Sequence, residues 1–237
     1  MKHIPNLITL ANLLCGCISI VATFSGHIAL AGFLIFIAAI LDFLDGLSAR
    51  LLNAYSEIGK QLDSLADIVS FGVAPAVIAF RIMFANQADL PFAYLPYIAF
   101  AMVLFAALRL AKFNVDNTQT EHFIGMPTPA NGLFWASLPL VLRDLHEKGL
   151  TAVEAIVFHP VAIAALCVLF AVLMVLPMPV LSFKFKSTDF VPNWQRYVLV
   201  WFVLGLYFII GISAIPIGIL VYPLLSLTLR QSSAFRK

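Results

Sequence analysis

The sequence predicts an all-α membrane protein, a polytopic bundle of about eight transmembrane helices with six to eight as the range. Composition is the first observation: 62% of the 237 residues are hydrophobic, 11% are charged, and the mean hydropathy is +1.00. A soluble domain needs more charge to cover its surface, so soluble classes are excluded. The second observation is that apolar runs follow one another along the whole chain with no soluble stretch between them. We therefore expect a single integral-membrane domain over residues 1–237.

The helices are expected in order from the N-terminal end. Pro5 and Asn6 are typical of a helix start, and the first apolar run follows them directly. A helix needs about 20 residues to cross the hydrocarbon core, and most of the runs meet that length. The runs lie near residues 7–25, 28–51, 60–85, 93–114, 127–143, 155–177, 196–212 and 214–230.

Prolines and glycines predict the breaks in the C-terminal part. Pro177, Pro179 and Pro192 predict a loop between the sixth and seventh runs. Pro216 and Gly211 predict a tight hairpin between the last two runs. The last two spans should therefore be antiparallel neighbours.

Basic residues predict the orientation of the bundle. With eight spans and both termini in the cytoplasm, the outer side receives three basic residues: Arg81, Arg143 and Lys148. The inner side receives eleven: Lys2, Arg50, Lys60, Arg109, Lys112, Lys184, Lys186, Arg196, Arg230, Arg236 and Lys237. Positive charge gathers in cytoplasmic loops, so this bias supports the even number of spans and the direction.

Charge and cysteine content exclude other classes of function. A formal net charge of +2 is too small to indicate nucleic-acid binding. The three cysteines, Cys15, Cys17 and Cys167, have neither the number nor the spacing of a zinc site or a disulfide framework. We expect them to be packing residues.

Four carboxylates interrupt the apolar pattern between the second and third runs. Asp42 and Asp45 are spaced i, i+3, and Asp63 and Asp67 are spaced i, i+4, so each pair lies on one helix face. A short connection makes the two helices antiparallel neighbours, so the two acidic faces are expected to meet at one depth, near the cytoplasmic ends.

Four converging carboxylates repel one another and lose hydration, which protonation or divalent cations would relieve. Hard cations such as Mg²⁺ or Mn²⁺ take oxygen ligands, and two of them side by side form a clamp for phosphoryl chemistry. The alternatives are that a membrane aspartate pairs helices by hydrogen bonding or forms part of a proton relay.

The same residues form a motif that resembles the signature of the CDP-alcohol phosphatidyltransferase family. The fixed positions of that signature are all filled at the right spacing by Asp42, Asp45, Gly46, Ala49, Arg50, Gly59, Asp63 and Asp67. The resemblance implies transfer of a phosphatidyl group from CDP-diacylglycerol to an alcohol, with release of CMP and with two divalent ions, Mg²⁺ or Mn²⁺, per site.

The resemblance also implies a role for each aspartate. Asp42 and Asp63 would bridge the two metals, and Asp45 would complete one metal site. Asp67 would complete the other and act as general base towards the acceptor hydroxyl. A hydroxyl is a poor nucleophile at neutral pH, which is why a base is needed.

The donor lipid is expected to bind beside the aspartates. The resemblance implies that Gly46, Ala49 and Arg50 hold the cytidine diphosphate, and two glycines at the mouth of the site would let a bulky ligand approach the backbone. For the polar residues of the first helix, an N-cap with interfacial side chains is the alternative interpretation. The full expected set for CDP-diacylglycerol is Asn6, Thr9, Gly46, Ala49, Arg50, Ser56 and Gly59.

A second motif concerns the acceptor. The run Arg109-Leu110-Ala111-Lys112-Phe113-Asn114-Val115, followed by Phe123-Ile124-Gly125-Met126-Pro127-Thr128-Pro129, resembles the family members that act on serine. It departs from their pattern at Lys112, where arginine is expected, and at Met126, where leucine is expected. The resemblance implies L-serine as acceptor, held by Arg109, Lys112 and Asn114; alternatively Arg109 and Lys112 are positive-inside anchors.

The resemblance extends to the organisation of the protein. It implies a homodimer in the prokaryotic inner membrane, with the active site facing the cytoplasm, a catalytic core near residues 1–143 and additional spans near 155–230. Two alternatives stay open: the same chemistry on glycerol 3-phosphate or inositol phosphate, and a cation- or proton-coupled transporter that uses the aspartates as its ion site.

Overall fold

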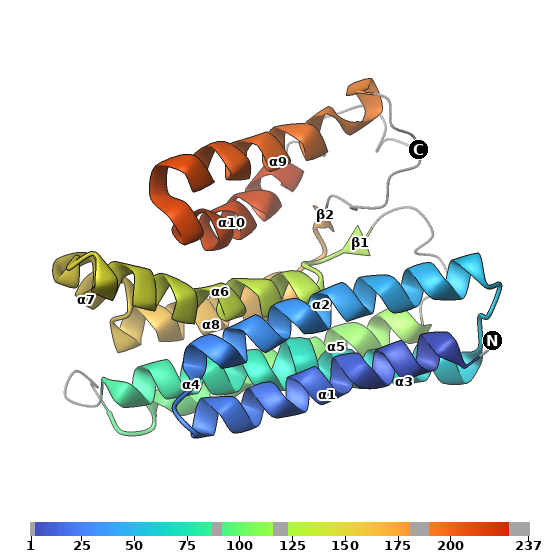
Figure 1. Ribbon diagram of the computed structural model, residues 1–237, viewed down its shortest axis with the longest axis horizontal. Helices are drawn as coiled ribbons and strands as arrows, with labels where there is room; N and C mark the ends of the chain where they lie inside the picture. Colours follow the sequence, from blue (N-terminus) through green and yellow to red (C-terminus); the bar gives the residue numbers. More distant parts are fainter. Residues whose placement is uncertain (1–2, 87–91, 116–122, 181–189, 228–237) are drawn as a thin grey trace.

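The structure is a computed structural model, and it describes residues 3–86, 92–115, 123–180 and 190–227. Helices dominate it, as the sequence predicts (Figure 1). The first half consists of α1 (Ile4–Phe24), α2 (Ile28–Leu51), α3 (Glu57–Asp67), the π-helix η1 (Ile68–Val73), α4 (Ala74–Ala85), the 3₁₀-helix η3 (Leu95–Phe100) and α5 (Ala101–Val115). The second half consists of β1 (Phe123–Ile124), α6 (Thr128–Glu147), α7 (Thr151–Val157), α8 (Pro160–Val175), β2 (Pro179–Val180), α9 (Phe190–Ile210), the 3₁₀-helix η4 (Gly211–Ser213) and α10 (Ala214–Leu227).

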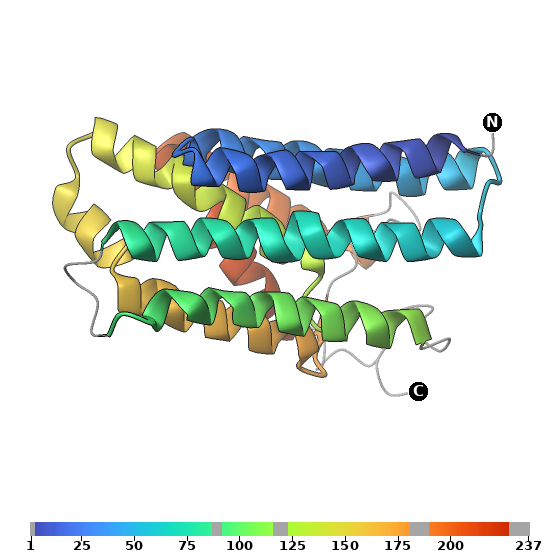
Figure 2. The ribbon, with the colours of Figure 1, turned by 90° about the horizontal axis from the view of Figure 1, so that it is seen from below.

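Each predicted apolar run corresponds to one of these helices or to a stack of them. Helices α3, η1 and α4 follow one another as a single rod (Figure 2). Among the described residues, five helical stretches are long and apolar enough to cross a membrane, or six if the bent α7–α8 pair is one span. The chain is therefore an integral membrane protein, and the number of crossings and the side of each terminus stay predictions.

The sixth run is broken where the sequence suggested one span. Helices α7 and α8 meet at an angle of 46°. Pro160 explains the break, because the residue before a proline is disfavoured in helical conformation and His159 has an extended ψ of 132°. Pro192 also differs from the prediction of a loop: α9 begins at Phe190, so Pro192 lies in the first turn, where it removes no helical hydrogen bond.

Small residues allow the helices to pack closely. A Cβ atom at Gly32 of α2 would collide with the Ala136 carbonyl oxygen of α6. At Gly132 of α6 it would lie 2.6 Å from Cδ1 of Phe71 in η1. Close backbone approach of this kind is typical of helices that associate in a bilayer.

The core lies among α2, α4, α6 and α8. The rings of Phe134 on α6 and Phe170 on α8 have centroids 4.2 Å apart, and Trp135 contacts both rings edge-on. Phe71 of η1 is fully buried in the same cluster. The middle of the π-helix after Asp67, residues 70–72, is thus buried in the core.

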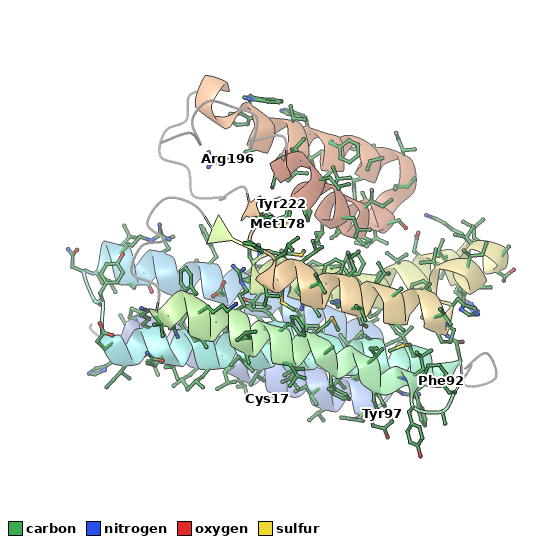
Figure 3. The ribbon with its side chains drawn as sticks, turned by 180° about the vertical axis from the view of Figure 1, so that it is seen from behind. Cys17, Phe92, Tyr97, Met178, Arg196 and Tyr222 are labelled. Atoms are coloured by element: carbon green, nitrogen blue, oxygen red, sulfur yellow. The ribbon has the colours of Figure 1, made fainter. Side chains whose placement is uncertain are left out.

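The C-terminal hairpin of α9 and α10 lies beside the bundle (Figure 1). Gly211 makes the turn with a positive φ of 65°, which confirms the predicted hairpin. A small cluster of Met178, Val180, Leu199 and Tyr222 packs the hairpin against β2, and Figure 3 shows Met178 and Tyr222 together there. The sequence did not predict that β2 pairs with β1, Phe123 opposite Val180.

Candidate functional site

Three of the four predicted aspartates meet between α2 and α3. Carboxylate oxygens of Asp42, Asp63 and Asp67 all lie within 4.8 Å of one another. Asp42 comes from the C-terminal half of α2, while Asp63 and Asp67 occupy successive turns of α3. The i, i+4 spacing therefore produces the predicted convergence.

The fourth aspartate lies beside this trio and bonds to α1. Asp45 is buried, and its Oδ2 accepts a hydrogen bond of 2.6 Å from Oγ1 of Thr9. The same hydroxyl lies 3.0 Å from the Pro5 carbonyl oxygen. Thr9, expected at the nucleotide, is thus a partner of a predicted metal ligand, so α1 contributes directly to the acidic site.

The trio fits a hard divalent cation. Asp63 Oδ1 and Asp67 Oδ1 are buried and have no hydrogen-bond partner among the described residues. A buried carboxylate oxygen without a partner is costly, and a cation would relieve both the lost hydration and the mutual repulsion. Oxygen-only donor sets are typical of Mg²⁺, Ca²⁺ and Mn²⁺. Within the described part of the chain, this is the only trio of acidic, histidine or cysteine side chains close enough to share an ion.

A cavity of about 560 Å³ opens beside the trio. Asp45 and Asp63 form part of its wall, so the acidic site and the cavity are continuous. Six of the seven residues expected to bind CDP-diacylglycerol line it: Asn6, Thr9, Gly46, Ala49, Ser56 and Gly59. Most residues expected to bind the donor lipid thus line the same cavity.

The seventh residue, Arg50, lies outside the lining. Its side chain is exposed, and its Nε donates a 3.0 Å hydrogen bond to the carbonyl oxygen of Gly46, which does line the cavity. In this conformation the guanidinium turns back along α2. Tyr55 and Lys60, which the sequence analysis did not assign to the donor lipid, line the cavity instead.

Ser56 and Gly59 form the start of α3 at the cavity wall. The Ser56 hydroxyl caps the helix by accepting a 3.0 Å hydrogen bond from the Gly59 N–H. A Cβ atom at Gly59 would lie 3.0 Å from Ser56 Oγ and 3.1 Å from Asn6 Oδ1. A side chain at this position would therefore press on Ser56 and Asn6, where α1 and α3 meet at the cavity.

The three residues expected at the acceptor all lie on α5 but have different surroundings. Arg109 is buried and donates a 3.2 Å hydrogen bond to the carbonyl oxygen of Met174, and it is close enough to Asp67 for an electrostatic interaction. Lys112 is exposed on α5. The amide nitrogen of Asn114 donates to Ser64 Oγ at 2.9 Å, which ties α5 to α3.

Two polar residues of α6 bond to Asp67 and to the π-helix that follows it, and the sequence predicted a role for neither. Thr128 Oγ1 donates a 3.2 Å hydrogen bond to Asp67 Oδ2, and Asn131 Nδ2 donates a 2.8 Å hydrogen bond to the carbonyl oxygen of Phe71. Both side chains are buried. Their i, i+3 spacing after Pro127 was the available signal, but it pointed to no partner.

Comparison with known proteins agrees with this site. Over 137 residues the chain is 41% identical to the CDP-diacylglycerol–serine O-phosphatidyltransferase of Bacillus subtilis, covering 56% of this chain and 73% of the relative. The relatives of the same name in Helicobacter pylori and Saccharomyces cerevisiae are 39% and 36% identical, over 53% and 67% of this chain. The chain covers 52% and 63% of their respective lengths.

The family comparison covers most of the chain. The CDP-alcohol phosphatidyltransferase family matches residues 2–205, which include the acidic trio, the cavity and the second motif. The chain belongs to the CDP-alcohol phosphatidyltransferase family.

Proposed function

We propose that this protein transfers the phosphatidyl group of CDP-diacylglycerol to L-serine, giving phosphatidylserine and CMP. The observation that carries the proposal is the acidic trio beside a cavity lined by six residues of the family motif. The names of the relatives support serine as the acceptor.

In the proposed reaction, the serine hydroxyl oxygen forms a bond to the phosphorus that carries diacylglycerol. The bond between that phosphorus and the bridging diphosphate oxygen breaks, and CMP leaves with the oxygen. Asp67 takes the hydroxyl proton as general base. The buried position of Asp67 beside Asp42 and Asp63 supports this role. The serine hydroxyl and the diphosphate of the donor would both meet at these three aspartates.

Divalent cations complete the proposed site. Asp42, Asp45, Asp63 and Asp67 would hold two Mg²⁺ or Mn²⁺ ions. When bound, such ions would neutralise charge on the attacking serine oxygen and on the leaving oxygen of the diphosphate. The buried, unpartnered carboxylate oxygens support a cation at the trio.

Two sets of residues would bind the two substrates. Asn6, Thr9, Gly46, Ala49, Ser56 and Gly59 would enclose the cytidine diphosphate in the cavity, with Arg50 at its edge. Arg109, Lys112 and Asn114 would hold serine. The proximity of Arg109 to Asp67 supports a carboxylate contact near the base.

The membrane setting follows from the same proposal. The acyl chains of the donor stay in the bilayer while its head group enters the cavity from the cytoplasmic side. We expect the protein in the inner membrane, as the bacterial relatives suggest. The family resemblance implies a homodimer. We also expect a catalytic core near residues 1–143, although α8 packs into the same hydrophobic core.

An acceptor screen tests the proposal. Purified protein in detergent is given CDP-diacylglycerol and Mn²⁺ or Mg²⁺, and CMP release is measured with L-serine, glycerol 3-phosphate or inositol phosphate. Release with L-serine alone is the expected result. Release with another acceptor would show that serine is not the acceptor, while the proposed metal site would stand. No release with any acceptor would overturn the proposal.

A further inference from the structure

The hydrogen bond between Thr128 and Asp67 joins the second motif to the acidic trio. Thr128 is the first residue of α6, and its hydroxyl donates to Asp67 Oδ2 at 3.2 Å. Both side chains are buried, with 2% and 7% exposure. The other oxygen, Asp67 Oδ1, is buried without a hydrogen-bond partner among the described residues. The two oxygens of one carboxylate therefore have different surroundings.

Backbone contacts fix the position of Thr128. The segment Gly125–Thr128 lies against the C-terminal end of α8, where the N–H of Met126 donates to the Leu173 carbonyl oxygen at 2.9 Å. The N–H of Gly125 donates to the Met178 carbonyl oxygen, also at 2.9 Å. Gly125 has a positive φ of 77°, and a Cβ atom there would collide with the Met174 carbonyl oxygen. This segment is therefore hydrogen-bonded to the last turn of α8 and to the residues that follow it.

The helix that carries Asp67 is fixed from the same side. The π-helix η1 begins at Ile68, directly after Asp67, and π-turns are rare and occur frequently at functional sites. Asn131, one turn after Thr128 on α6, donates a 2.8 Å hydrogen bond to the Phe71 carbonyl oxygen in η1. From the opposite side, Ser70 Oγ donates to the Asn12 carbonyl oxygen at 3.0 Å. The start of α6 thus holds both the Asp67 carboxylate and the backbone that follows it.

We infer that Thr128 is a positioning residue that orients the Asp67 carboxylate. A carboxylate rotates about its last side-chain bond, and a donor fixed on Oδ2 selects one orientation. With Oδ2 held, the position of Oδ1 is fixed as well, and this buried oxygen without a partner among the described residues is the one free to meet a cation or an acceptor hydroxyl. The inference rests on the proposed role of Asp67. Partners that hold metal ligands typically change metal affinity or activity by about 10–100-fold when they are removed.

Two substitutions remove the hydroxyl, and one keeps it. T128V has nearly the shape of threonine, T128A inserts no new atom, and T128S retains the donor. The matched control is T23V, because Thr23 is also buried and, among the described residues, its hydroxyl bonds only to the Ser19 carbonyl oxygen within its own helix. Melting temperature, Mn²⁺ affinity from electron paramagnetic resonance of the free ion, and kcat and KM for L-serine are measured for each variant.

For T128V and T128A we expect a loss of about 10–100-fold in Mn²⁺ affinity or in kcat. Their melting temperatures should equal that of T23V. T128S should recover the wild-type values. Wild-type values of both quantities in T128V and T128A would overturn the inference. So would failure of both variants to fold while T23V folds, since the role would then be structural.

The proposed function can fail separately from this inference. If wild-type protein releases no CMP with L-serine, the proposed function fails. Weaker Mn²⁺ binding by T128V than by T23V would still support the orientation of Asp67 by Thr128, and equal binding by the two would overturn it.

Discussion

At the scale of single residues, the spacing of the aspartates predicted their meeting but not their separate surroundings. Asp42, Asp63 and Asp67 form the trio, whereas Asp45 bonds to Thr9 on α1. The helical period places side chains on a face, and the short connection places two faces together. The helical period does not specify which neighbouring hydroxyl donates a hydrogen bond to each carboxylate. Those partners come from α1 and α6, whose positions depend on the packing of the whole bundle.

Asp67 is the residue whose removal should affect chemistry most selectively. D67N should lower kcat by about 10²–10⁴-fold, the usual contribution of a general base. CDP-diacylglycerol binding should be largely retained, because Asp67 is not part of the cavity wall. CMP release measures the first quantity, and competition binding of the donor lipid measures the second. Substantial turnover by D67N would remove Asp67 as the base.

Substitution of Asp42 tests the cation site through protein stability, without an activity assay. Mn²⁺ at about 100 times its dissociation constant should stabilise the folded protein by about 2.7 kcal/mol, because only the folded protein holds the trio together. D42N should lose this effect in thermal melting with and without a chelator. The control D144N changes an aspartate that pairs with Lys148, away from the trio, and should keep the effect. Equal stabilisation of D42N and D144N would contradict a cation at the trio.

At the scale of elements, hydropathy predicted each apolar run but not the irregular turns within it. The π-helix Ile68–Val73 lies inside a run that reads as one continuous span. Its carbonyl groups find partners such as Asn131 on α6, far along the chain. The β1–β2 pairing likewise depends on two distant segments. Features that depend on a distant partner leave little signal in local periodicity, whereas a break caused by proline, as at Pro160, has a local signal that the hydropathy of the run does not reveal.

Helix spacing gives a prediction at this scale. G32A should destabilise the fold by about 1–3 kcal/mol, since the new methyl group meets the Ala136 backbone and α2 and α6 must separate. G205A makes the same substitution in α9, where a Cβ atom meets nothing within 4 Å. Thermal melting in detergent should show a loss for G32A and none for G205A. Equal melting temperatures would show that the α2–α6 contact tolerates the methyl group.

At the scale of the whole molecule, the uneven distribution of basic residues predicts which end of the bundle faces the cytoplasm. The predicted inner residues Arg50, Lys60 and Lys112 lie at the end of the bundle that holds the aspartates, whereas Lys148 lies after α6 at the other end (Figures 1 and 2). Six further predicted inner residues lie outside the described residues: Lys2, Lys184, Lys186, Arg230, Arg236 and Lys237. Orientation in the membrane therefore rests on the positive-inside rule and stays a prediction.

Cysteine labelling tests this orientation in cells. In a background with Cys15, Cys17 and Cys167 replaced, single cysteines are placed at Glu57 and Lys148, two exposed positions at opposite ends. A membrane-impermeant maleimide added outside intact cells should label K148C, and E57C should react only after the membrane is opened. The reverse pattern would place the aspartates on the outer side.

The most direct test of the whole account follows the serine itself. Radiolabelled L-serine is incubated with CDP-diacylglycerol, a divalent cation and the purified protein, and label is counted in the lipid extract beside CMP release. The account predicts label in lipid in equal amount to CMP, lost on chelation and in D67N. CMP release without serine in the lipid, or label that persists in D67N, would contradict phosphatidyl transfer to serine at these aspartates.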